Sequence, residues 1–161
     1  MPQHHLLPPD LAAPTFLTPG VTVPAPACAP PAPAIPQSAV ELLRHAAAAL
    51  RNAAAEPAAQ DRYIGAHLAA LRAAAAMLAA RAAPGRASSR PRSVWVALPR
   101  VAPGLSEWAA FFAASATVRA ALEAGLRGVT CRQADDLVRD AETFLVAVAQ
   151  ALRLPHQTVL V

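Results

Sequence analysis

"DRYIGAHLAALRAAAAML", residues 61–78, carries the clearest structural pattern in this chain of 161 residues. The run is rich in alanine and leucine, which are strong helix formers, and it contains no proline. Pro57 precedes it, and Pro84 with Gly85 follows it. The sequence therefore predicts one long helix from about Ala58 to Ala82.

Two other helices carry capping boxes where they start. Ser38 and Glu41 predict the start of a first helix, and Thr130 and Gln133 predict the start of a last helix that reaches Leu154. Apolar residues recur every three or four positions along the last helix. They predict its inner face, which comprises Ala134, Leu137, Ala141, Leu145, Val148 and Leu152.

Two helices are expected between these. Ser93 starts a short segment, "SVWVAL", that Pro99 should end, and Pro103 with Gly104 opens a longer helix that reaches about Ala124. The predicted buried stripe of the longer helix comprises Trp108, Phe111, Phe112, Ser115 and Leu122. No stretch shows the period-two alternation of a strand. The sequence therefore predicts an all-α fold, an antiparallel bundle of four to five helices.

The bundle is expected to occupy residues 38–155, between two tails. Eleven of the 17 prolines fall in residues 1–36, so residues 1–37 are predicted to be a disordered Pro/Ala-rich tail, and residues 156–161 a short C-terminal tail. No apolar run reaches the roughly 18 residues of a membrane span, and no signal peptide is recognisable. Two distant cysteines indicate no disulfide framework. We therefore expect a cytoplasmic protein without membrane contact.

Arg62 and His67 are the candidate catalytic residues. The large apolar side chains predict a buried face of their helix, made of Ile64, Leu71, Ala75 and Leu78. At 100° per residue, His67 lies at the edge of this face and Arg62 points away from it, about 140° from His67. The two side chains do not converge within one helix, so a common site needs a second helix or a second subunit.

The spacing of this pair is expected by chance. Fourteen arginines and five histidines in 161 positions predict about 1.3 arginines five to seven residues before a histidine, and the chain has one. Two interpretations therefore stay open. The pair is catalytic, or a solvated arginine lies near a histidine packed at the edge of the core.

Four blocks of sequence, in chain order, resemble a known family. They are "RYIGAHLAALRAAAAMLAAR", "RPRSVW", "EWAAFFAASA" and "TCRQADDLVRDAETFLVAVAQAL". Over residues 38–153 they resemble an actinobacterial family of HEPN (higher eukaryote and prokaryote nucleotide-binding) proteins. The resemblance implies a bundle of four to five helices that often forms homodimers.

The resemblance also implies a chemistry for Arg62 and His67. Many HEPN proteins are ribonucleases with an arginine, four to six intervening residues and a histidine, and this pair has four residues between. In such enzymes the histidine helps to activate the ribose 2′-OH and the arginine stabilises the phosphate. That motif usually lies towards the end of the domain, whereas here it lies in the second helix. HEPN domains without the pair serve as binding or toxin–antitoxin-like modules.

The remaining charged residues leave both binding and plain solvation open. Five arginines fall in a segment without acidic residues and could follow a phosphate backbone or remain solvated: Arg81, Arg86, Arg90, Arg92 and Arg100. An acidic cluster in the last helix is expected to face water and comprises Asp135, Asp136, Asp140 and Glu142. The net charge of +4 permits a polyanionic partner. No metal site and no cofactor is expected.

The sequence thus favours a HEPN-like helical module, a dimeric binding or regulatory protein linked to RNA or nucleotide biology. Its partners would be a second copy of the chain, an RNA or nucleotide, or another protein. One alternative is a metal-independent endoribonuclease that uses Arg62 and His67. The other is a structural helical adaptor recruited through its proline-rich tail.

Overall fold

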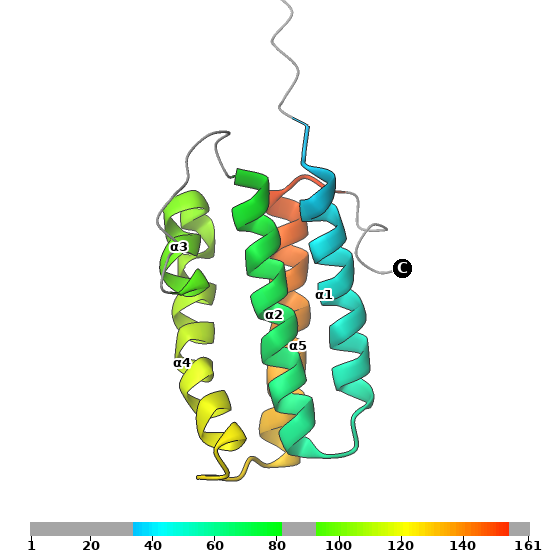
Figure 1. Ribbon diagram of the computed structural model, residues 1–161, viewed down its shortest axis with the longest axis vertical. Coiled ribbons are helices and arrows are strands. Elements are labelled where there is room, and N and C mark those ends of the chain that lie inside the picture. The colour runs from blue at the N-terminus through cyan, green and yellow to red at the C-terminus, as the bar shows by residue number, and fades with distance from the viewer. Residues whose placement is uncertain (1–33, 82–92, 155–161) are drawn as a thin grey trace, which may run out of the picture. The chain divides into compact units, whose positions relative to one another are not determined.

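A computed structural model describes residues 34–81 and 93–154 of the chain, and these ranges are helical with short connections (Figure 1). The elements are α1 (Gln37–Ala55), α2 (Ala59–Arg81), α3 (Val94–Val101), the 3-10 turn η1 (Pro103–Leu105), α4 (Ser106–Glu123) and α5 (Cys131–Ala151). No strand occurs within the described ranges. The prediction of an all-α bundle is confirmed. Most of the predicted N-terminal tail and all of the C-terminal one lie outside the described residues.

Side-chain bonds between helix ends show the directions in which the helices run. Arg81, at the end of α2, donates a 3.2 Å hydrogen bond to the carbonyl of Ala151, at the end of α5. Gln60, at the start of α2, donates a 3.2 Å bond to the carbonyl of Leu122, near the end of α4. Helix α2 is therefore parallel to α5 and antiparallel to α4, and Figure 1 shows that it is also antiparallel to α1.

Helix α2 lies at the centre of the bundle, in contact with α1, α3, α4 and α5. Small side chains make this position possible because they let neighbouring backbones approach closely. Ala66, Ala70 and Ala73 are fully buried along it. At Gly65 the approach to α1 is tight, since a Cβ atom there would lie 2.7 Å from the Cβ of Ala53. Contrary to the expectation from the sequence, α2 is long and apolar enough to span a membrane by length and composition. This is weak evidence for membrane insertion, because a core helix passes the same test and α2 packs against four other helices.

The predicted buried face of α2 is wrong. All four residues of that face, Ile64, Leu71, Ala75 and Leu78, are only partly buried. Met77 and most of the other alanines of α2, such as Ala70 and Ala74, are buried completely. The prediction gave weight to the largest apolar side chains, but a central helix buries its smallest ones where the neighbouring helices come closest. Because alanines occur on most sides of α2, the sequence pattern did not indicate which side of this helix faces the core.

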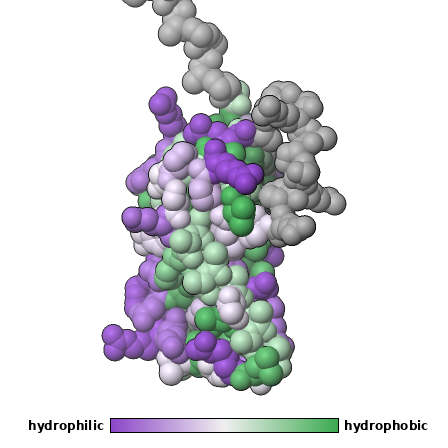
Figure 2. Space-filling view, turned by 90° about the vertical axis from the view of Figure 1, so that its left-hand side faces the viewer, coloured by the Kyte–Doolittle hydropathy of each residue, from purple (hydrophilic) through white to green (hydrophobic). Residues whose placement is uncertain are grey.

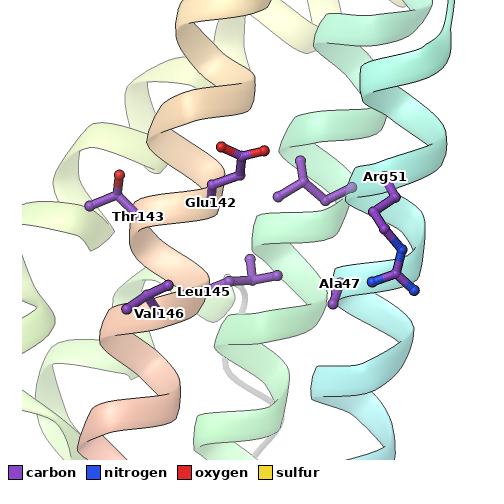
Figure 3. Close-up of a pocket in the computed structure, with 7 residues that line it drawn as sticks. Ala47, Arg51, Glu142, Thr143, Leu145 and Val146 are labelled. Atoms are coloured by element: carbon purple, nitrogen blue, oxygen red, sulfur yellow. The ribbon is translucent and has the colours of Figure 1, made fainter. Parts of the chain in front are cut away.

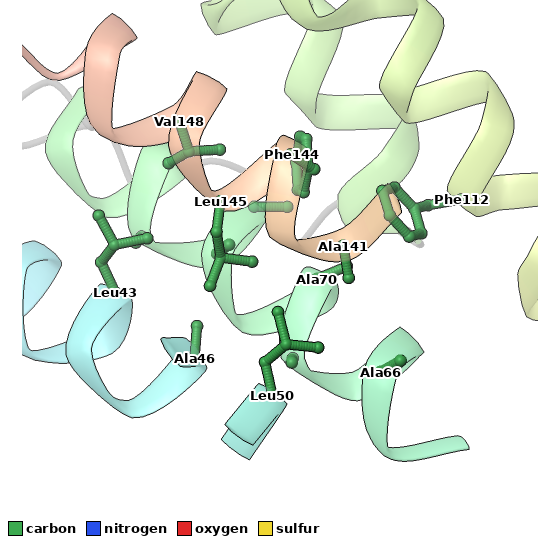
Figure 4. Packing of buried hydrophobic residues seen from close by; sticks show 14 of the residues in the cluster. Leu43, Ala46, Leu50, Ala66, Ala70, Phe112, Ala141, Phe144, Leu145 and Val148 are labelled. Atoms are coloured by element: carbon green, nitrogen blue, oxygen red, sulfur yellow. The ribbon is translucent and has the colours of Figure 1, made fainter. Parts of the chain in front are cut away.

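Larger side chains fill the space on either side of α2. Near α3 and α4, Trp95 stacks on Phe112 with ring centroids 5.3 Å apart, and Phe112 lies 5.1 Å from Phe144 of α5. Near α1, Leu43 packs in the same core cluster as Leu145 (Figure 4). The predicted inner face of α5 is confirmed, because all six of its residues are buried.

Some helix boundaries and one buried position differ from expectation. The Thr130–Gln133 capping box is present. The Ser38 box is absent because α1 already begins at Gln37, after Pro36. Helix α3 continues past Pro99 to Val101, and the burial of Trp95 and Leu98 compensates for the single backbone donor that proline lacks.

Phe111 does not belong to the buried stripe of α4, since 42% of its surface is exposed. The face of the domain formed by α3 and α4 carries apolar areas between hydrophilic ones (Figure 2). An exposed aromatic ring is therefore available on α4 for contact with another molecule.

Candidate functional site

His67 is sealed inside the bundle, with no surface exposed to solvent. Its Nδ1 lies 2.8 Å from the hydroxyl oxygen of Ser115 in α4. That hydroxyl donates a 3.1 Å hydrogen bond to the backbone carbonyl of Phe112, so it accepts from Nδ1–H of the histidine. The tautomer is therefore the one with the proton on Nδ1. The other nitrogen, Nε2, is buried without a hydrogen-bond partner among the described residues.

Aromatic rings enclose the imidazole. Trp95 and Phe112 approach it edge to face, with centroids 5.8 and 6.2 Å away. Burial, and to a smaller extent the positive charge of Arg119, lowers the pKa of His67 to about 4. The side chain is therefore neutral at pH 7 and, in this conformation, out of reach of an RNA phosphate or ribose.

Arg62 is bound to the protein rather than solvated, and only 11% of its side chain is exposed. Its Nε lies 2.8 Å from a carboxylate oxygen of Asp135 in α5, and its Nη1 donates to the backbone carbonyl of Glu56. The guanidinium thus joins the turn between α1 and α2 to the start of α5. The expectation of a solvated arginine is wrong, because the true inner side of α2 includes this position.

The two candidate catalytic residues are therefore not brought together within one copy. Arg62 contacts α5 and the α1–α2 turn, whereas His67 contacts α3 and α4. Each has a structural partner of its own. Their joint catalytic role stays a prediction, and in this arrangement neither side chain is free for it.

Only two of the five arginines predicted to contact RNA, Arg81 and Arg100, lie within the described residues. Arg86, Arg90 and Arg92 lie outside them. Arg81 donates to the last turn of α5, and Arg100 is exposed on α3. Within the described ranges the expected basic surface therefore has two exposed arginines, Arg81 and Arg100, and Arg81 also bonds to the end of α5.

The acidic cluster of α5 does not simply face water. Asp135 pairs with Arg62, and Asp136 pairs with Arg139 on its own helix. Asp136 and Asp140 are partly buried, and both line a pocket of about 240 Å³ between α2, α4 and α5. We call it the Tyr63 pocket, lined by Tyr63, Phe111, Val118, Arg127, Val129, Gln133, Asp136, Leu137 and Asp140. About half of the side-chain surface of Asp135 and of Asp136 is exposed and Glu142 is exposed, so most of this cluster is solvated as expected, whereas Asp140 is only partly exposed.

The polar groups of the Tyr63 pocket are tuned by burial. Burial raises the pKa of the Tyr63 phenol, and the positive charge of Arg127 opposes this. Burial also raises the pKa of Asp140, with a further contribution from the charge of Asp136. The phenol is therefore a neutral donor and acceptor of hydrogen bonds at pH 7. Perturbed groups that converge on a pocket mark a candidate binding site.

The walls of the pocket supply complementary contacts. Val118 and Leu137 are apolar, the exposed ring of Phe111 offers a stacking surface, and Arg127 offers a cation for an anionic group. The side chain of Gln133 is already engaged in capping α5. A planar molecule that carries N–H donors and a negative group matches this combination. Among the described residues, no group of three or more His, Cys, Asp or Glu side chains could hold a metal ion.

A family comparison matches residues 53–149 to the SAV_6107-like HEPN description. The match spans the end of α1 to the last turn of α5 and includes all nine residues of the Tyr63 pocket. The chain belongs to the SAV_6107-like HEPN family. No curated protein and no solved structure matches this HEPN chain significantly.

Sequence reasoning placed Asp136 and Asp140 in an acidic cluster but did not predict the Tyr63 pocket of this HEPN domain. Tyr63 is the single tyrosine of the chain and directly follows Arg62, and a buried tyrosine usually directs its hydroxyl to a polar site. That was a usable indication. Arg127 and Asp140 lie on a loop and on a helix far from Tyr63 in sequence, so only the packing of α5 against α2 shows that they share a site.

Proposed function

We propose that this HEPN domain is a homodimeric binding module of RNA or nucleotide biology, and that the Tyr63 pocket receives a base. The pocket carries the proposal. It combines an exposed ring, a carboxylate, a phenol and a guanidinium around a volume of about 240 Å³, which suits one base with its sugar. Asp140 would accept from base N–H groups, Phe111 would stack on the base, and Arg127 would attract a phosphate.

The sealed histidine supports binding rather than cleavage. A general base must come within hydrogen-bond distance of the hydroxyl that it deprotonates. His67 has no exposed surface, and its Nδ1–H is held by Ser115. The unexposed Nε2 would reach a ribose only after α3 or α4 moved.

Calorimetric titration of the full chain with mononucleotides and with short single-stranded RNA tests the pocket. We expect Phe111→Ala and Arg127→Ala each to weaken binding at least tenfold, about 1.4 kcal/mol. The matched controls Val96→Ala on α3 and Arg72→Ala on α2 replace exposed residues and should leave affinity unchanged. The salt dependence should become less steep for Arg127→Ala. Equal affinity in the pocket variants and the controls would remove the pocket from the mechanism.

The endoribonuclease alternative has one observation in its favour, because the family match includes both Arg62 and His67. Incubation with structured and single-stranded RNA in EDTA tests it, beside His67→Gln and Arg62→Ala with folding checked by circular dichroism. We expect no cleavage by the wild type. Metal-independent cleavage that disappears in a folded His67→Gln variant would establish the enzyme and refute the binding-only proposal.

A further inference from the structure

Two polar groups of the Tyr63 pocket have hydrogen-bonding capacity that no other described residue uses. Tyr63 is only 7% exposed, yet its hydroxyl is not closed off from solvent and has no hydrogen-bond partner within the described ranges. Of the two carboxylates in the pocket, Asp136 pairs with Arg139, whereas Asp140 has no ion-pair or hydrogen-bond partner among the described residues. Both groups are therefore available to a ligand.

Gln133 adds a donor whose orientation is fixed by the helix cap. Its amide oxygen accepts the backbone N–H of Thr130 at 3.0 Å and the Thr130 hydroxyl at 3.1 Å. Since only the oxygen of an amide side chain can accept an N–H, the NH₂ group occupies the other branch. Its two donors are not used by another described residue. The pocket thus has an amide donor at its α5 entrance.

Gln133 and Asp140 lie on one face of α5, because seven residues make two turns, about 10 Å along the axis. Along the helix the pocket therefore presents a donor and then two carboxylate oxygens. Burial and the neighbouring charge of Asp136 raise the pKa of Asp140, so N–H donors from a ligand would restore bonds that this carboxylate has lost to burial.

The pairing edge of guanine is complementary to this order of groups. Its O6 accepts, and its N1–H and N2–H₂ donate side by side, so one carboxylate can accept both donors at once. Adenine and cytosine carry a ring nitrogen acceptor on this edge, and uracil has one N–H between two carbonyls. Each of these bases would place a lone pair against the carboxylate, which costs binding energy.

We propose that the Tyr63 pocket is selective for guanine and that Asp140 determines this selectivity. The proposal rests on the base-binding function proposed above and names the base. Asp140 accepts from N1–H and N2–H₂, and the Gln133 amide donates to O6. The Tyr63 hydroxyl binds a remaining polar atom of the base or sugar. A free guanine nucleotide and a guanosine in single-stranded RNA share this chemistry.

Calorimetric titration of the full chain with GMP, IMP, AMP, CMP and UMP tests the selectivity. IMP differs from GMP only in lacking the N2 amino group. We expect GMP to bind at least about tenfold more tightly than each of the others. Oligouridine with one central guanosine, beside plain oligouridine, distinguishes the sources. A preference in both sets identifies RNA as a ligand, and a preference among the free nucleotides alone identifies a free nucleotide.

The variant Asp140→Asn replaces one acceptor by a donor with little change in shape. It should weaken GMP binding at least about tenfold and remove the preference for GMP over IMP. It should also bind xanthosine monophosphate more tightly than the wild type does, because xanthine has a carbonyl where guanine has its N2 amino group. This gain cannot come from an unfolded chain.

Glu142→Gln is the matched control, since it removes one negative charge from the same helix. Glu142 is exposed and, with Arg51, lines a separate hollow of about 550 Å³ between α1 and α5 (Figure 3). This variant should leave the affinities for all the nucleotides unchanged. A loss of GMP binding equal to that of Asp140→Asn would make the effect one of net charge and overturn the contact.

The outcomes separate guanine selectivity from the proposed function. Equal binding of all the nucleotides, still dependent on Phe111 and Arg127, overturns the selectivity and leaves the pocket as a general base site. A guanine preference that persists in Asp140→Asn, or equal affinity for GMP and IMP, overturns the role of Asp140. Absence of binding to every nucleotide and RNA overturns the selectivity and the proposed function together.

Discussion

Acid should destabilise this domain through His67, and the size of the effect follows from its burial. The histidine is sealed between Trp95 and Phe112, and burial lowers its pKa to about 4. In the unfolded chain the same imidazole has a pKa of about 6.5. Between these two values the unfolded state binds a proton that the folded state excludes. Falling pH therefore favours unfolding in this window.

The magnitude can be worked out from the two pKa values. Above about pH 6.5 neither state is protonated, so the group makes no difference to the free energy of unfolding. The loss should be about 2 kcal/mol at pH 5 and about 3 kcal/mol at pH 4, with little further change below. For a domain of this size that is a large part of the total stability.

Urea unfolding, followed by circular dichroism at several pH values, measures the effect. Other groups titrate in the same window, so the comparison is between the wild type and His67→Gln, which is neutral at every pH and can still bond to Ser115. The stability of the wild type should fall more steeply than that of the variant by the amounts above. Parallel curves, or an NMR titration in which His67 of the folded protein protonates near pH 6.5, would refute the reasoning.

Three substitutions test other contacts through the free energy of unfolding. Gly65→Ala should cost about 1–3 kcal/mol despite its better helix propensity, because the new Cβ would lie 2.7 Å from that of Ala53; a more stable variant would show that α1 shifts freely. Arg62→Lys should cost about 1–2 kcal/mol, since an ammonium cannot reach both Asp135 and the Glu56 carbonyl; equal stability would make the arginine dispensable for folding. Thr130→Ala should cost about 1 kcal/mol through loss of the capping box, and an unchanged melting temperature would contradict this.

Much of the fold was predictable because its determinants are local. Prolines, glycines and the Thr130–Gln133 box mark helix ends through backbone geometry that needs no tertiary contact. The inner face of α5 was also predictable, because leucine and valine alternate there with charged residues at helical spacing. For α2 the same method failed. Its sequence is apolar on most sides, and in the folded domain most of its buried residues are alanines.

The candidate site was less predictable because burial and charge pairing arise from long-range packing. The sequence correctly placed Arg62 and His67 on one helix. It could not predict their partners, because Asp135 and Ser115 lie 73 and 48 positions away along the chain. Without those partners Arg62 appeared solvated and His67 appeared to lie at an edge. The Tyr63 pocket was invisible for the same reason, since its residues come from three helices and a loop.

The sequence by itself determined that this chain is helical, where most of its helices begin and end, and to which family it is similar. These properties depend on backbone propensities and on patterns that a single segment carries. Only the tertiary structure decided that His67 is neutral and sealed, that Arg62 joins α5 to the α1–α2 turn, and that Asp140 shares a pocket with Tyr63. The physical reason is that desolvation and ion pairing depend on which distant residues surround a group, and the packing of α2 among its neighbours determines that.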